Sequence, residues 1–366
     1  MRAAVLREQP GQLTIEDLTI DHPGPGEVLV DVVAAGLCHS DLHFMQGKFR
    51  TPLPAVLGHE SAGVVSEVGA GVTYVKPGDH VVCCLSLFCG ECVPCLSGRP
   101  YACAGTGRLA RSRGQTPRLT GGDGSKVEQF SHLGGFAEQM LVHERAVVRI
   151  AEDLPLDRAA LVGCAVLTGT GAVFRTARVE PGSSVAVIGA GGIGLAAIQG
   201  AQIAGAGMVI AIDISETKLA TAKVFGATHT IDASSTDDVV AAVRDLTGGG
   251  VAFSFEAIGT KPTAEQAFRM VVPGGMATII GMVPNNQPLE IRGMDLLAGR
   301  RLQGSTMGSN RFRIDIPRLL DMYRDKRLKL DELISSRIDL DAVNDGYDAL
   351  NQGTVTRSVI MFDDPS

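Results

Sequence analysis

Hydrophobic and polar residues follow two different patterns along this chain, and the change falls near residue 165. Up to that point, apolar residues come in short β-branched runs, as in residues 28–33 and 62–68. Turn sequences rich in Gly and Pro bound these runs, for example at residues 23–26 and 77–79. Many short strands separated by such turns predict a barrel-like β domain.

Beyond residue 165, apolar strand-like runs alternate with helical segments. Strands are expected at residues 184–188, 208–212, 229–231, 251–256 and 276–280, and helices at residues 195–204, 218–225, 237–246 and 263–270. This alternation predicts a parallel, doubly wound sheet. It ends near Ser305, after which we expect helices at residues 317–325 and 341–350 and a closing strand at residues 358–361.

We therefore expect an α/β protein with two domains. Residues 166–306 would form the doubly wound domain. Residues 1–165 and 307–366 would form the β-barrel-type domain, to which the end of the chain returns. A length of 366 residues is what two domains of ordinary size require.

Charge and hydropathy narrow the range of partners. The formal net charge is −7 and no basic stripe is present, so nucleic acid is not an expected partner. The first residues, Met1 to Glu8, lack an apolar signal core, which indicates a cytoplasmic protein. An uncharged run at residues 185–212 is long enough to span a bilayer, but several glycines break it. It fits a buried strand, a turn, a helix and a second buried strand better, so no membrane partner is expected.

Four of the eight cysteines lie close together in a segment rich in Gly and Pro. They are Cys89, Cys92, Cys95 and Cys103. Four thiolates at this spacing can close a tetrahedral cage around structural zinc. An iron–sulfur cluster is the main rival, but its usual run places the fourth cysteine after three residues and follows it with Pro. Here seven residues intervene and Ala104 follows, so we favour zinc over iron–sulfur or disulfides.

A second set of metal-ligand residues is spread along the chain. Cys38 and Cys164 flank the sequence Gly58-His59-Glu60, and two thiols with one imidazole form the ligand set of a catalytic zinc with an open fourth position. Glu60 would lie behind the metal, and Asp41 could accept the free ring N–H of His59. Taken alone, residues 58–60 would fit an ordinary turn equally well, and a lone buried Cys164 would be inert.

Residues 189–194 carry the pattern G-x-G-x-x-G between an expected strand and an expected helix. The glycines are Gly189, Gly191 and Gly194, with Gly192 between them, and Asp213 follows 19 residues after Gly194 (213 − 194) at the end of the next strand. In this context the pattern is the dinucleotide-binding fingerprint. Backbone N–H groups at the helix N-terminus would hold the pyrophosphate, and Asp213 would bind the adenosine ribose and repel a 2′-phosphate.

Residues 104–133 form a polar, Gly-rich segment that is basic in its first half. The basic residues are Arg108, Arg111, Arg113 and Arg118. A surface loop of this length is often functional, although a solvated excursion explains it equally well.

The whole chain resembles the zinc-dependent medium-chain alcohol dehydrogenases. The resemblance is carried by Gly58-His59-Glu60, the four-cysteine lobe, the later single Cys164, and the glycine fingerprint with its Asp213. It implies a GroES-like catalytic domain, a Rossmann cofactor domain, NAD, and two zinc ions per chain, one catalytic and one structural. It also implies a homodimer, with a tetramer as the other possibility.

The resemblance further assigns individual roles. Catalytic zinc would be held by Cys38, His59 and Cys164, with Glu60 and Asp41 behind it, and structural zinc by the four lobe cysteines. Ser40 would touch the substrate oxygen, and His43 would end the proton relay. The cofactor would contact His39, Thr168, Gly189, Gly191, Gly192, Ile193, Gly194, Asp213, Lys218, Ile280, Met282, Ser305, Met307 and Arg357. Leu85, Met282 and Thr306 would line the substrate pocket.

Two positions depart from the family pattern. Leu85 stands where many relatives carry an aromatic residue, and His39 where many carry Arg. The first widens the pocket, and the second makes the phosphate contact weaker and dependent on pH.

The expected reaction is NAD-dependent oxidation of primary alcohols to aldehydes, and the reverse. One alternative is a dehydrogenase for thiol adducts of formaldehyde such as S-hydroxymethyl-glutathione, and another is a non-catalytic binding protein on the same scaffold. The glutathione-adduct members carry an Arg four residues after the last lobe cysteine. Here that position is Gly107, with Arg108 next to it. This difference favours a free alcohol substrate.

Overall fold

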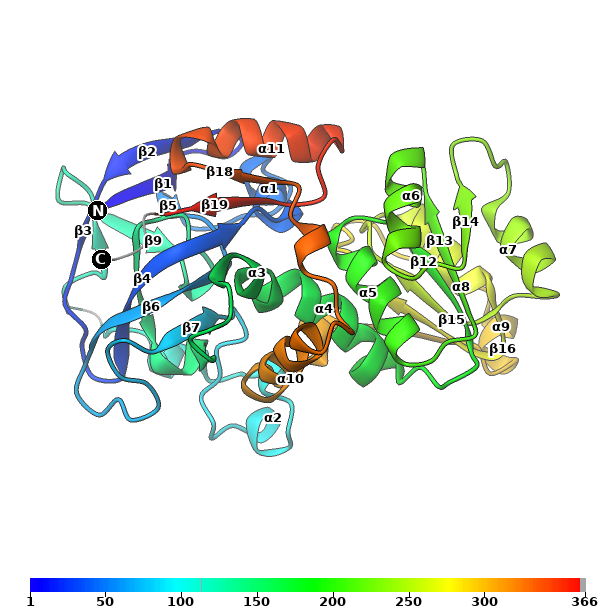
Figure 1. Cartoon of the computed structure of the whole chain (residues 1–366), viewed down its shortest axis with the longest axis horizontal. Coiled ribbons are helices and arrows are strands. Elements are labelled where there is room, and N and C mark those ends of the chain that lie inside the picture. Colours follow the sequence, from blue (N-terminus) through cyan, green and yellow to red (C-terminus); the bar gives the residue numbers. More distant parts are fainter. Residues whose placement is uncertain (113, 363–366) are drawn as a thin grey trace. The chain divides into compact units, whose positions relative to one another are not determined.

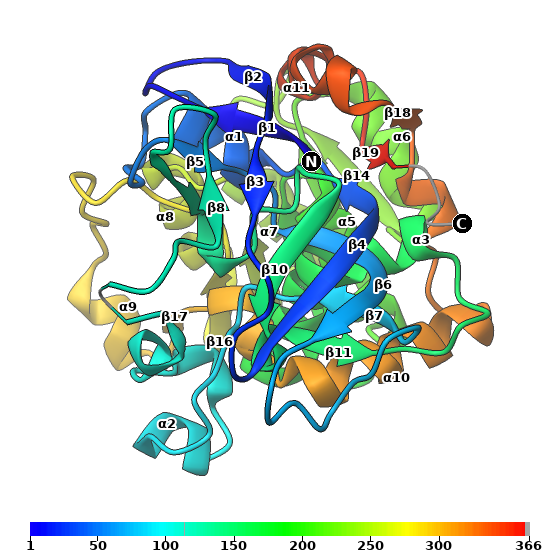
Figure 2. The same cartoon turned by 90° about the vertical axis from the view of Figure 1, so that its left-hand side faces the viewer.

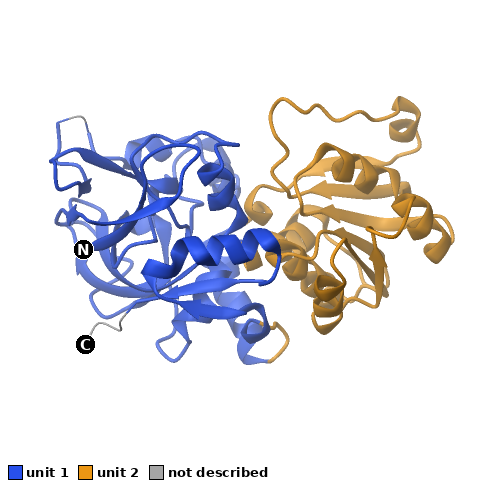
Figure 3. Ribbon diagram, turned by 90° about the horizontal axis from the view of Figure 1, so that it is seen from above, with its two compact units in different colours: residues 1–164, 311–325, 330–366 blue, residues 165–310, 326–329 orange. Residues whose placement is uncertain are grey.

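The computed structural model describes residues 1–112 and 114–362, and the chain divides into two compact units (Figure 3). Unit 1 comprises Met1–Cys164, Arg311–Asp325 and Leu330–Ser366, and unit 2 comprises Ala165–Asn310 and Lys326–Lys329. The sequence pattern placed the two main boundaries after residues 165 and 306, whereas the units divide after residues 164 and 310. Arg113 of the basic segment lies outside the described residues.

Unit 1 is built on two antiparallel-rich sheets that form a half-barrel (Figure 2). The first has the strand order β2-β1-β5-β9-β8-β3, and the second has the order β11-β7-β6-β4-β19-β18, with β10 paired to β4. The strands are β1 Arg2–Leu6, β2 Leu13–Asp17, β3 Thr19–Ile20, β4 Glu27–Gly36, β5 Ala55–Val56, β6 Glu60–Val68, β7 His80–Cys83, β8 Leu119–Thr120, β9 Lys126–Gln129, β10 Gln139–His143, β11 Val147–Arg149, β18 Ser336–Ile338 and β19 Ser358–Met361. The helices are α1 His39–Met45, α2 Val93–Leu96, α3 Leu156–Leu161, α10 Phe312–Arg324 and α11 Val343–Gln352.

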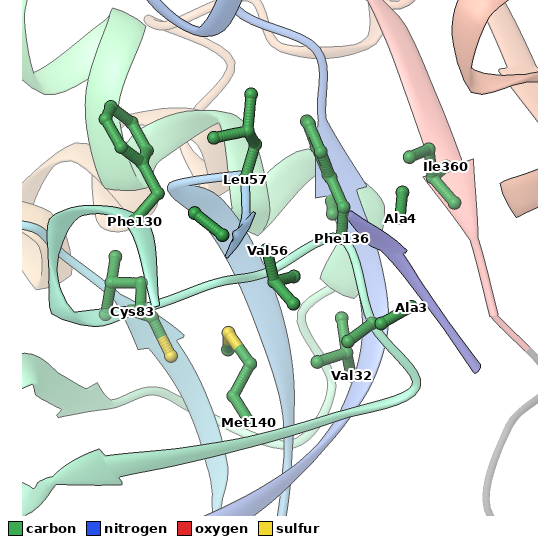
Figure 4. Close-up of a cluster of buried hydrophobic side chains, with 14 of the residues drawn as sticks. Ala3, Ala4, Val32, Val56, Leu57, Cys83, Phe130, Phe136, Met140 and Ile360 are labelled. Carbon is green, nitrogen blue, oxygen red and sulfur yellow. The ribbon is translucent and has the colours of Figure 1, made fainter. Parts of the chain in front are cut away.

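A single apolar cluster fills the space between these sheets (Figure 4). Val32 of β4, Val56 of β5, Met140 of β10 and Ile360 of β19 all turn into it and are at most 1% exposed. Strand β19 pairs antiparallel with β4, so the last strand of the chain completes the sheet begun near its start. The expected return of the chain end to the first domain thus has a physical reason, since β4 needs a partner on that edge.

Unit 2 holds one parallel sheet with the strand order β14-β13-β12-β15-β16-β17 (Figure 1). Its strands are β12 Ser184–Ile188, β13 Met208–Asp213, β14 His229–Asp232, β15 Val251–Glu256, β16 Val271–Ile279 and β17 Arg301–Gly304. Its helices are α4 Leu167–Gly171, α5 Gly192–Ile203, α6 Glu216–Val224, α7 Val239–Thr247, α8 Lys261–Arg269 and α9 Gly293–Leu297. The doubly wound α/β fold expected from the alternating pattern is confirmed.

Two elements begin five residues earlier than the sequence pattern suggested (276 − 271 and 317 − 312). Strand β16 starts at Val271 rather than at residue 276, with an irregularity in its register against β15 that accommodates residues 273–275. Helix α10 starts at Phe312 rather than at residue 317, and it contains Pro317. Both expected boundaries were wrong because Pro and Gly do not end these elements: a strand with an irregular register can include both, and a helix can include Pro.

One helical run was not foreseen. Leu156–Ala177 is continuous, and it is long and apolar enough to cross a membrane by length and composition alone, but 83% of its most apolar window is buried inside the protein. The buried core helix of a globular protein passes the same test. The uncharged run at residues 185–212 is divided into β12, α5 and β13, as the sequence predicted.

The basic segment after the cysteine lobe is tied down at two points by one buried carboxylate. Glu27 of β4 accepts hydrogen bonds from Arg111 and Arg118, and the shortest N–O distances are 2.6 Å and 2.7 Å. Arg111 also bonds Asp21 and the carbonyl of His22. Burial tends to raise the pKa of Glu27, but the two guanidinium groups outweigh it and the pKa is lowered. The segment is therefore a fastened loop, and two of its arginines are structural.

Candidate active site

Three segments that are distant in sequence bring four metal-ligand side chains together in unit 1. Donor atoms of Cys38, His59, Glu60 and Cys164 all lie within 4.8 Å of one another, and all four residues are buried. Cys38 is the residue that caps α1, and His59 directly precedes β6. Cys164 lies in a π-helical turn, Val162–Val166, inside the long helical run. Such turns are rare and frequently occur at functional sites.

Gly58 makes the sharp turn that delivers His59. Its φ of +90° favours glycine, and an added Cβ would lie 2.6 Å from the ring of Phe136. The N–H of Gly58 donates to Asp41 Oδ1 at 3.1 Å, and His59 Nδ1 lies 3.1 Å from the same oxygen. A carboxylate on Nδ1 fixes the ring and leaves Nε2 as the donor for a metal.

The protonation states of this cluster are strongly displaced from their ordinary values. A hydrogen bond from Cys164 lowers the pKa of Cys38 well below its usual value, and His59 and Arg357 add to this against the effect of burial. The same hydrogen bond between the two sulfur atoms, together with burial, raises the pKa of Cys164. Burial alone would lower the pKa of His59, but the nearby charges of Asp41 and Cys38 hold it well above its usual value. Without a metal, the thiolate of Cys38 therefore lies beside a protonated Cys164 and a positively charged His59.

Glu60 is buried next to the ligands and faces a buried arginine. Burial raises the pKa of Glu60 to about 8, although the charge of Arg357 opposes this. The Arg357 guanidinium lies 3.4 Å from Glu60 Oε1 and donates to the carbonyl of Leu37 at 2.6 Å. Arg357 was expected to face the cofactor pyrophosphate, but it is only 3% exposed and its contacts are with Glu60 and the chain before Cys38.

The donor set fits zinc. Two sulfur atoms and one ring nitrogen are the ligands that zinc accepts in catalytic sites, with a fourth position left for water or substrate. Asp41 behind His59 supplies the supporting carboxylate that such a ligand needs. The buried oxygens of Glu60 accept no hydrogen bond from the described residues, so Glu60 remains available near the metal position.

The two residues expected to move the proton lie on α1, next to the ligands. The Oγ of Ser40 lies 3.6 Å from Cys38 Sγ. His43 is partly buried, and its Nδ1 has no hydrogen-bond partner among the described residues. Burial and Lys48 lower its pKa, so the ring is neutral near pH 7 and can accept a proton. His39, expected at the pyrophosphate, is exposed at the start of the same helix.

The lobe cysteines form a second cluster in unit 1. Donor atoms of Cys89, Cys92, Cys95 and Cys103 lie within 4.8 Å of one another. Backbone N–H groups of the lobe point at its sulfur atoms, with Cys89 N at 3.2 Å and Gly105 N at 3.3 Å from Cys103 Sγ. The N–H of Cys95 lowers the pKa of Cys92 to about 6, which favours the thiolate that a metal requires. This arrangement fits the structural zinc cage expected from the spacing.

In unit 2 the glycine fingerprint joins β12 to α5. Helix α5 starts at Gly192, so its first N–H groups are free of helical partners and can hold phosphate. A Cβ on Gly194 would lie 1.7 Å from the carbonyl oxygen of Gly189, so this close approach requires glycine. Asp213 ends β13, and its carboxylate accepts the N–H groups of Ala190 at 2.7 Å and Ser215 at 3.1 Å. These two hydrogen bonds fix the conformation of the fingerprint turn. The same carboxylate lies at the end of β13, where the cofactor ribose is expected.

The remaining residues expected at the cofactor also lie in unit 2. Thr168 Oγ1 contacts Met307 Sδ at 3.5 Å, and Ser305 Oγ contacts Thr176 Oγ1 at 2.8 Å. Met307 has a φ of +49°, a conformation that is uncommon for a side chain of its size. The others are Ile193 and Lys218 at the starts of α5 and α6, and Ile280 and Met282 after β16. Their roles toward the cofactor stay predictions.

Sequence reasoning missed three features next to the metal ligands. The ring of Phe130 packs edge-on against His59 with centroids 5.8 Å apart. Arg357 pairs with Glu60, and Tyr347 of α11 is buried near Asp41. The pattern at residues 341–350 predicted the helix that carries Tyr347, but only the folded chain brings this side chain to the site.

Comparisons with known proteins agree with this site. Residues 24–152 match the alcohol dehydrogenase GroES-like domain, and residues 192–324 match the zinc-binding dehydrogenase domain. The chain is 36% identical to S-(hydroxymethyl)glutathione dehydrogenase of Paracoccus denitrificans, with 99% of each chain covered. Among solved structures, an alcohol dehydrogenase zinc-binding domain protein of Burkholderia ambifaria superposes with a TM-score of 0.94 at 34% identity, covering 99% of this chain and 98% of the other. Benzyl alcohol dehydrogenase of Acinetobacter calcoaceticus gives 0.91 at 32% identity, covering 99% of each.

These matches define a zinc-dependent oxidoreductase with a GroES-like and a Rossmann domain. The chain belongs to the zinc-dependent medium-chain alcohol dehydrogenases. Its cofactors are NAD and zinc, and its two clusters have the ligands for two zinc ions. The expected family, fold and cofactors are therefore confirmed.

The two metal clusters predict different responses to substitution. Cys38→Ala should remove one zinc and abolish turnover with the fold intact, because the surrounding site is formed by apolar packing and by Asp41. Cys92→Ser should also remove one zinc, but its main effect should be on stability, because metal binding orders the small lobe. We expect it to lower Tm by roughly 5–10 °C, which is about 2–3 kcal/mol for a domain of this size.

Zinc counting by native mass spectrometry, turnover and thermal melting distinguish the two variants. Wild-type rates in a Cys38→Ala protein shown to lack that zinc would refute the catalytic assignment. Unchanged melting of Cys92→Ser would refute the structural one.

Proposed function

We propose that this chain oxidises a –CH₂OH group to the corresponding carbonyl with NAD and catalyses the reverse reduction. The observation that carries the proposal is the buried Cys38–His59–Cys164 cluster, with Asp41 bonded to the outer nitrogen of the imidazole. Bound at this cluster, zinc would act as a Lewis acid that makes the alcohol proton easier to remove. A non-catalytic binding protein would not need the proton acceptors that accompany the ligands.

The residues of the site have separate roles in this reaction. Cys38, His59 and Cys164 hold the metal, and Ser40 receives the proton of the substrate hydroxyl on Oγ. His43 accepts it on its neutral ring and passes it to solvent. The C–H bond of the same carbon breaks as its C–O bond becomes C=O, and bound NAD would accept the hydride, so two electrons and one proton end on NADH and one proton on water. Apolar side chains, Leu85 among them, would exclude water from the reacting carbon.

The first substrate candidate is a thiol adduct of formaldehyde. S-(hydroxymethyl)glutathione carries the required –CH₂OH group, and the relative from Paracoccus denitrificans is named for it. The sequence favoured a free alcohol, whereas this match supports the adduct more strongly. Oxidation would give the S-formyl thioester and NADH.

The second candidate is a free aryl or aliphatic primary alcohol. It is favoured by Gly107, which offers no charge where an adduct carboxylate would need one. Arg108 next to it is highly exposed and lies 3.4 Å from Glu91, so its charge is partly matched on the surface. The structural match to benzyl alcohol dehydrogenase also supports this candidate.

Substrate preference can be decided by one panel of assays. We expect kcat/KM for formaldehyde plus glutathione to exceed that for benzyl alcohol or hexanol if the adduct is the substrate. Formaldehyde without thiol is the control for direct reaction. Equal or higher efficiency with benzyl alcohol, and no effect of added thiol, would overturn the adduct and establish the second candidate.

Asp213 is proposed to set the preference for NAD over NADP. A carboxylate that faces a ribose 2′-phosphate is strongly unfavourable, so removing its charge should relieve the discrimination. Asp213→Asn should raise the NADP/NAD ratio of kcat/KM by about tenfold, or about 1.4 kcal/mol. The substitution keeps an oxygen that can accept the N–H of Ala190. Equal wild-type efficiency with both cofactors would contradict this role.

We also propose that the chain forms a homodimer through unit 2. Strand β17 is the edge of the parallel sheet, and an unpaired edge can pair with another chain. The short helix α9 just before it exposes Met294 at 72% and Leu297 at 78%. A large apolar surface beside an open edge is typical of an association site.

Leu297→Glu should weaken this association and yield monomers, because a charge would have to be buried against the partner. Val93→Glu on α2 is the matched control, since Val93 is equally exposed at 74% in unit 1. Sedimentation velocity gives the mass. A wild-type monomer, or a Leu297→Glu dimer of unchanged affinity, would argue against this interface.

A cytoplasmic location is proposed as well, since all eight cysteines are free thiols. Cell fractionation with antibody detection would test it, and recovery in an oxidising compartment would contradict it.

A further inference from the structure

Two buried polar atoms near the catalytic cluster have no hydrogen bond among the described residues. One is Oδ2 of Asp41 on α1, and the other is the hydroxyl oxygen of Tyr347 on α11. Asp41 is 0% exposed and Tyr347 is 2% exposed. One atom is an acceptor and the other can donate, and a buried tyrosine hydroxyl usually has a partner.

Packing fixes Tyr347 close to the metal ligands. Its ring lies edge-on to Phe136, with centroids 6.2 Å apart, and Phe136 also packs against the turn at Gly58. The neighbouring Gly346 lies so close to Leu37 that an added Cβ would be 2.7 Å from its side chain. Helix α11 is therefore pressed against the residue that precedes Cys38.

The charges around the Tyr347 hydroxyl are mainly those of the site. Burial raises the pKa of Tyr347 well above its ordinary value, and Asp41 is the charged group that adds most, followed by Cys38 and Glu60. Arg357 opposes them. The hydroxyl therefore keeps its proton and faces anions, which is the condition for a hydrogen-bond donor.

We propose that Tyr347 is a positioning residue of the catalytic metal site: its phenolic O–H donates to one water that in turn donates to Asp41 Oδ2, and so holds the carboxylate that orients His59. The inference rests on the proposed catalytic zinc site and deepens it. Asp41 already uses Oδ1 for both Gly58 N–H and His59 Nδ1. With one oxygen bonded, the carboxylate can still turn about that contact, and a donor on Oδ2 stops this rotation.

The consequence reaches the metal through the imidazole. Groups that orient a ligand from behind typically change metal affinity by about 10–100-fold when they are removed. Tyr347→Phe deletes only the hydroxyl and keeps the ring against Phe136. We expect the catalytic zinc to be lost to a competing chelator about tenfold faster, at the low end of that range because Tyr347 acts through Asp41.

The matched control is Tyr323→Phe. Tyr323 of α10 also donates its hydroxyl to a carboxylate, that of Asp331 at 3.1 Å, but this pair is exposed and involves none of the ligands. Zinc released from the four-cysteine lobe, at an unchanged rate in every variant, provides an internal reference. Replacing the catalytic zinc with cobalt should give shifted visible absorption bands in Tyr347→Phe and wild-type bands in Tyr323→Phe.

A double-mutant test shows whether Tyr347 acts through Asp41. In an Asp41→Asn background, Tyr347→Phe should add little to the rate of zinc loss. The hydrogen bond can also be tested in metal-free protein by measuring the NMR chemical shift of ¹³Cζ in labelled tyrosine. This measurement does not require a Tyr347 variant. The shift should change for Tyr347 when Asp41 is changed to Asn, and the Tyr323 resonance should stay in place.

Three results would overturn the inference. One is an unchanged rate of zinc loss and unchanged cobalt bands in Tyr347→Phe, while the wild type holds two zinc ions. Another is a Tyr347→Phe protein that melts higher with the same zinc retention, as expected when an unpaired buried hydroxyl is removed. The last is a chemical shift of Tyr347 that does not change when Asp41 is replaced by Asn. A wild-type chain that binds a single zinc would instead refute the catalytic metal site, and with it this role.

Discussion

The structure of unit 1 depends on the burial of several ionisable groups at one site. Cys38, Asp41, Glu60 and Cys164 are each at most 4% exposed and lie within one small volume. Burying several such groups is unfavourable unless cations and hydrogen bonds compensate them. Arg357 supplies one positive charge, and a divalent ion would supply the rest. Three features of the fold position these groups. They are the turn at Gly58 before His59, the π-helical turn that holds Cys164, and the return of the last strand beside β4, which brings Arg357.

The sequence was informative where chemistry is encoded locally. The four lobe cysteines lie within one short segment, and the glycine fingerprint is continuous between a strand and a helix, so residue types and spacing were sufficient. Cys164 was a ligand candidate only because Cys38 and His59 need a third ligand, and the family resemblance then assigned it. The pairing of Arg357 with Glu60 was not predicted, because Glu60 lies in a strand from the other end of the chain. Such pairings depend on tertiary contacts that spacing does not record.

The helical run Leu156–Ala177 was not predicted, also because tertiary contacts decide its conformation. Gly163 and Gly169 lower helix propensity, which conceals a helix in the sequence. In the structure, a Cβ on Gly163 would lie 2.5 Å from the carbonyl of Cys83, and one on Gly169 would lie 2.4 Å from that of Ile193. These glycines are therefore explained by close packing on each side of the run. Packing has overridden the local preference, as it commonly does in buried helices.

The fastening of the basic loop to Glu27 has a consequence for evolution. Arg111 and Arg118 close the segment between them on one carboxylate, so its two ends are held at a fixed spacing whatever lies between. The entropy of closing a flexible loop rises slowly with length, by about 0.6 kcal/mol for each doubling. Insertions between the two arginines are therefore inexpensive for the fold. A lineage of such enzymes can change the length and composition of this loop while the buried clasp preserves the sheet beneath it.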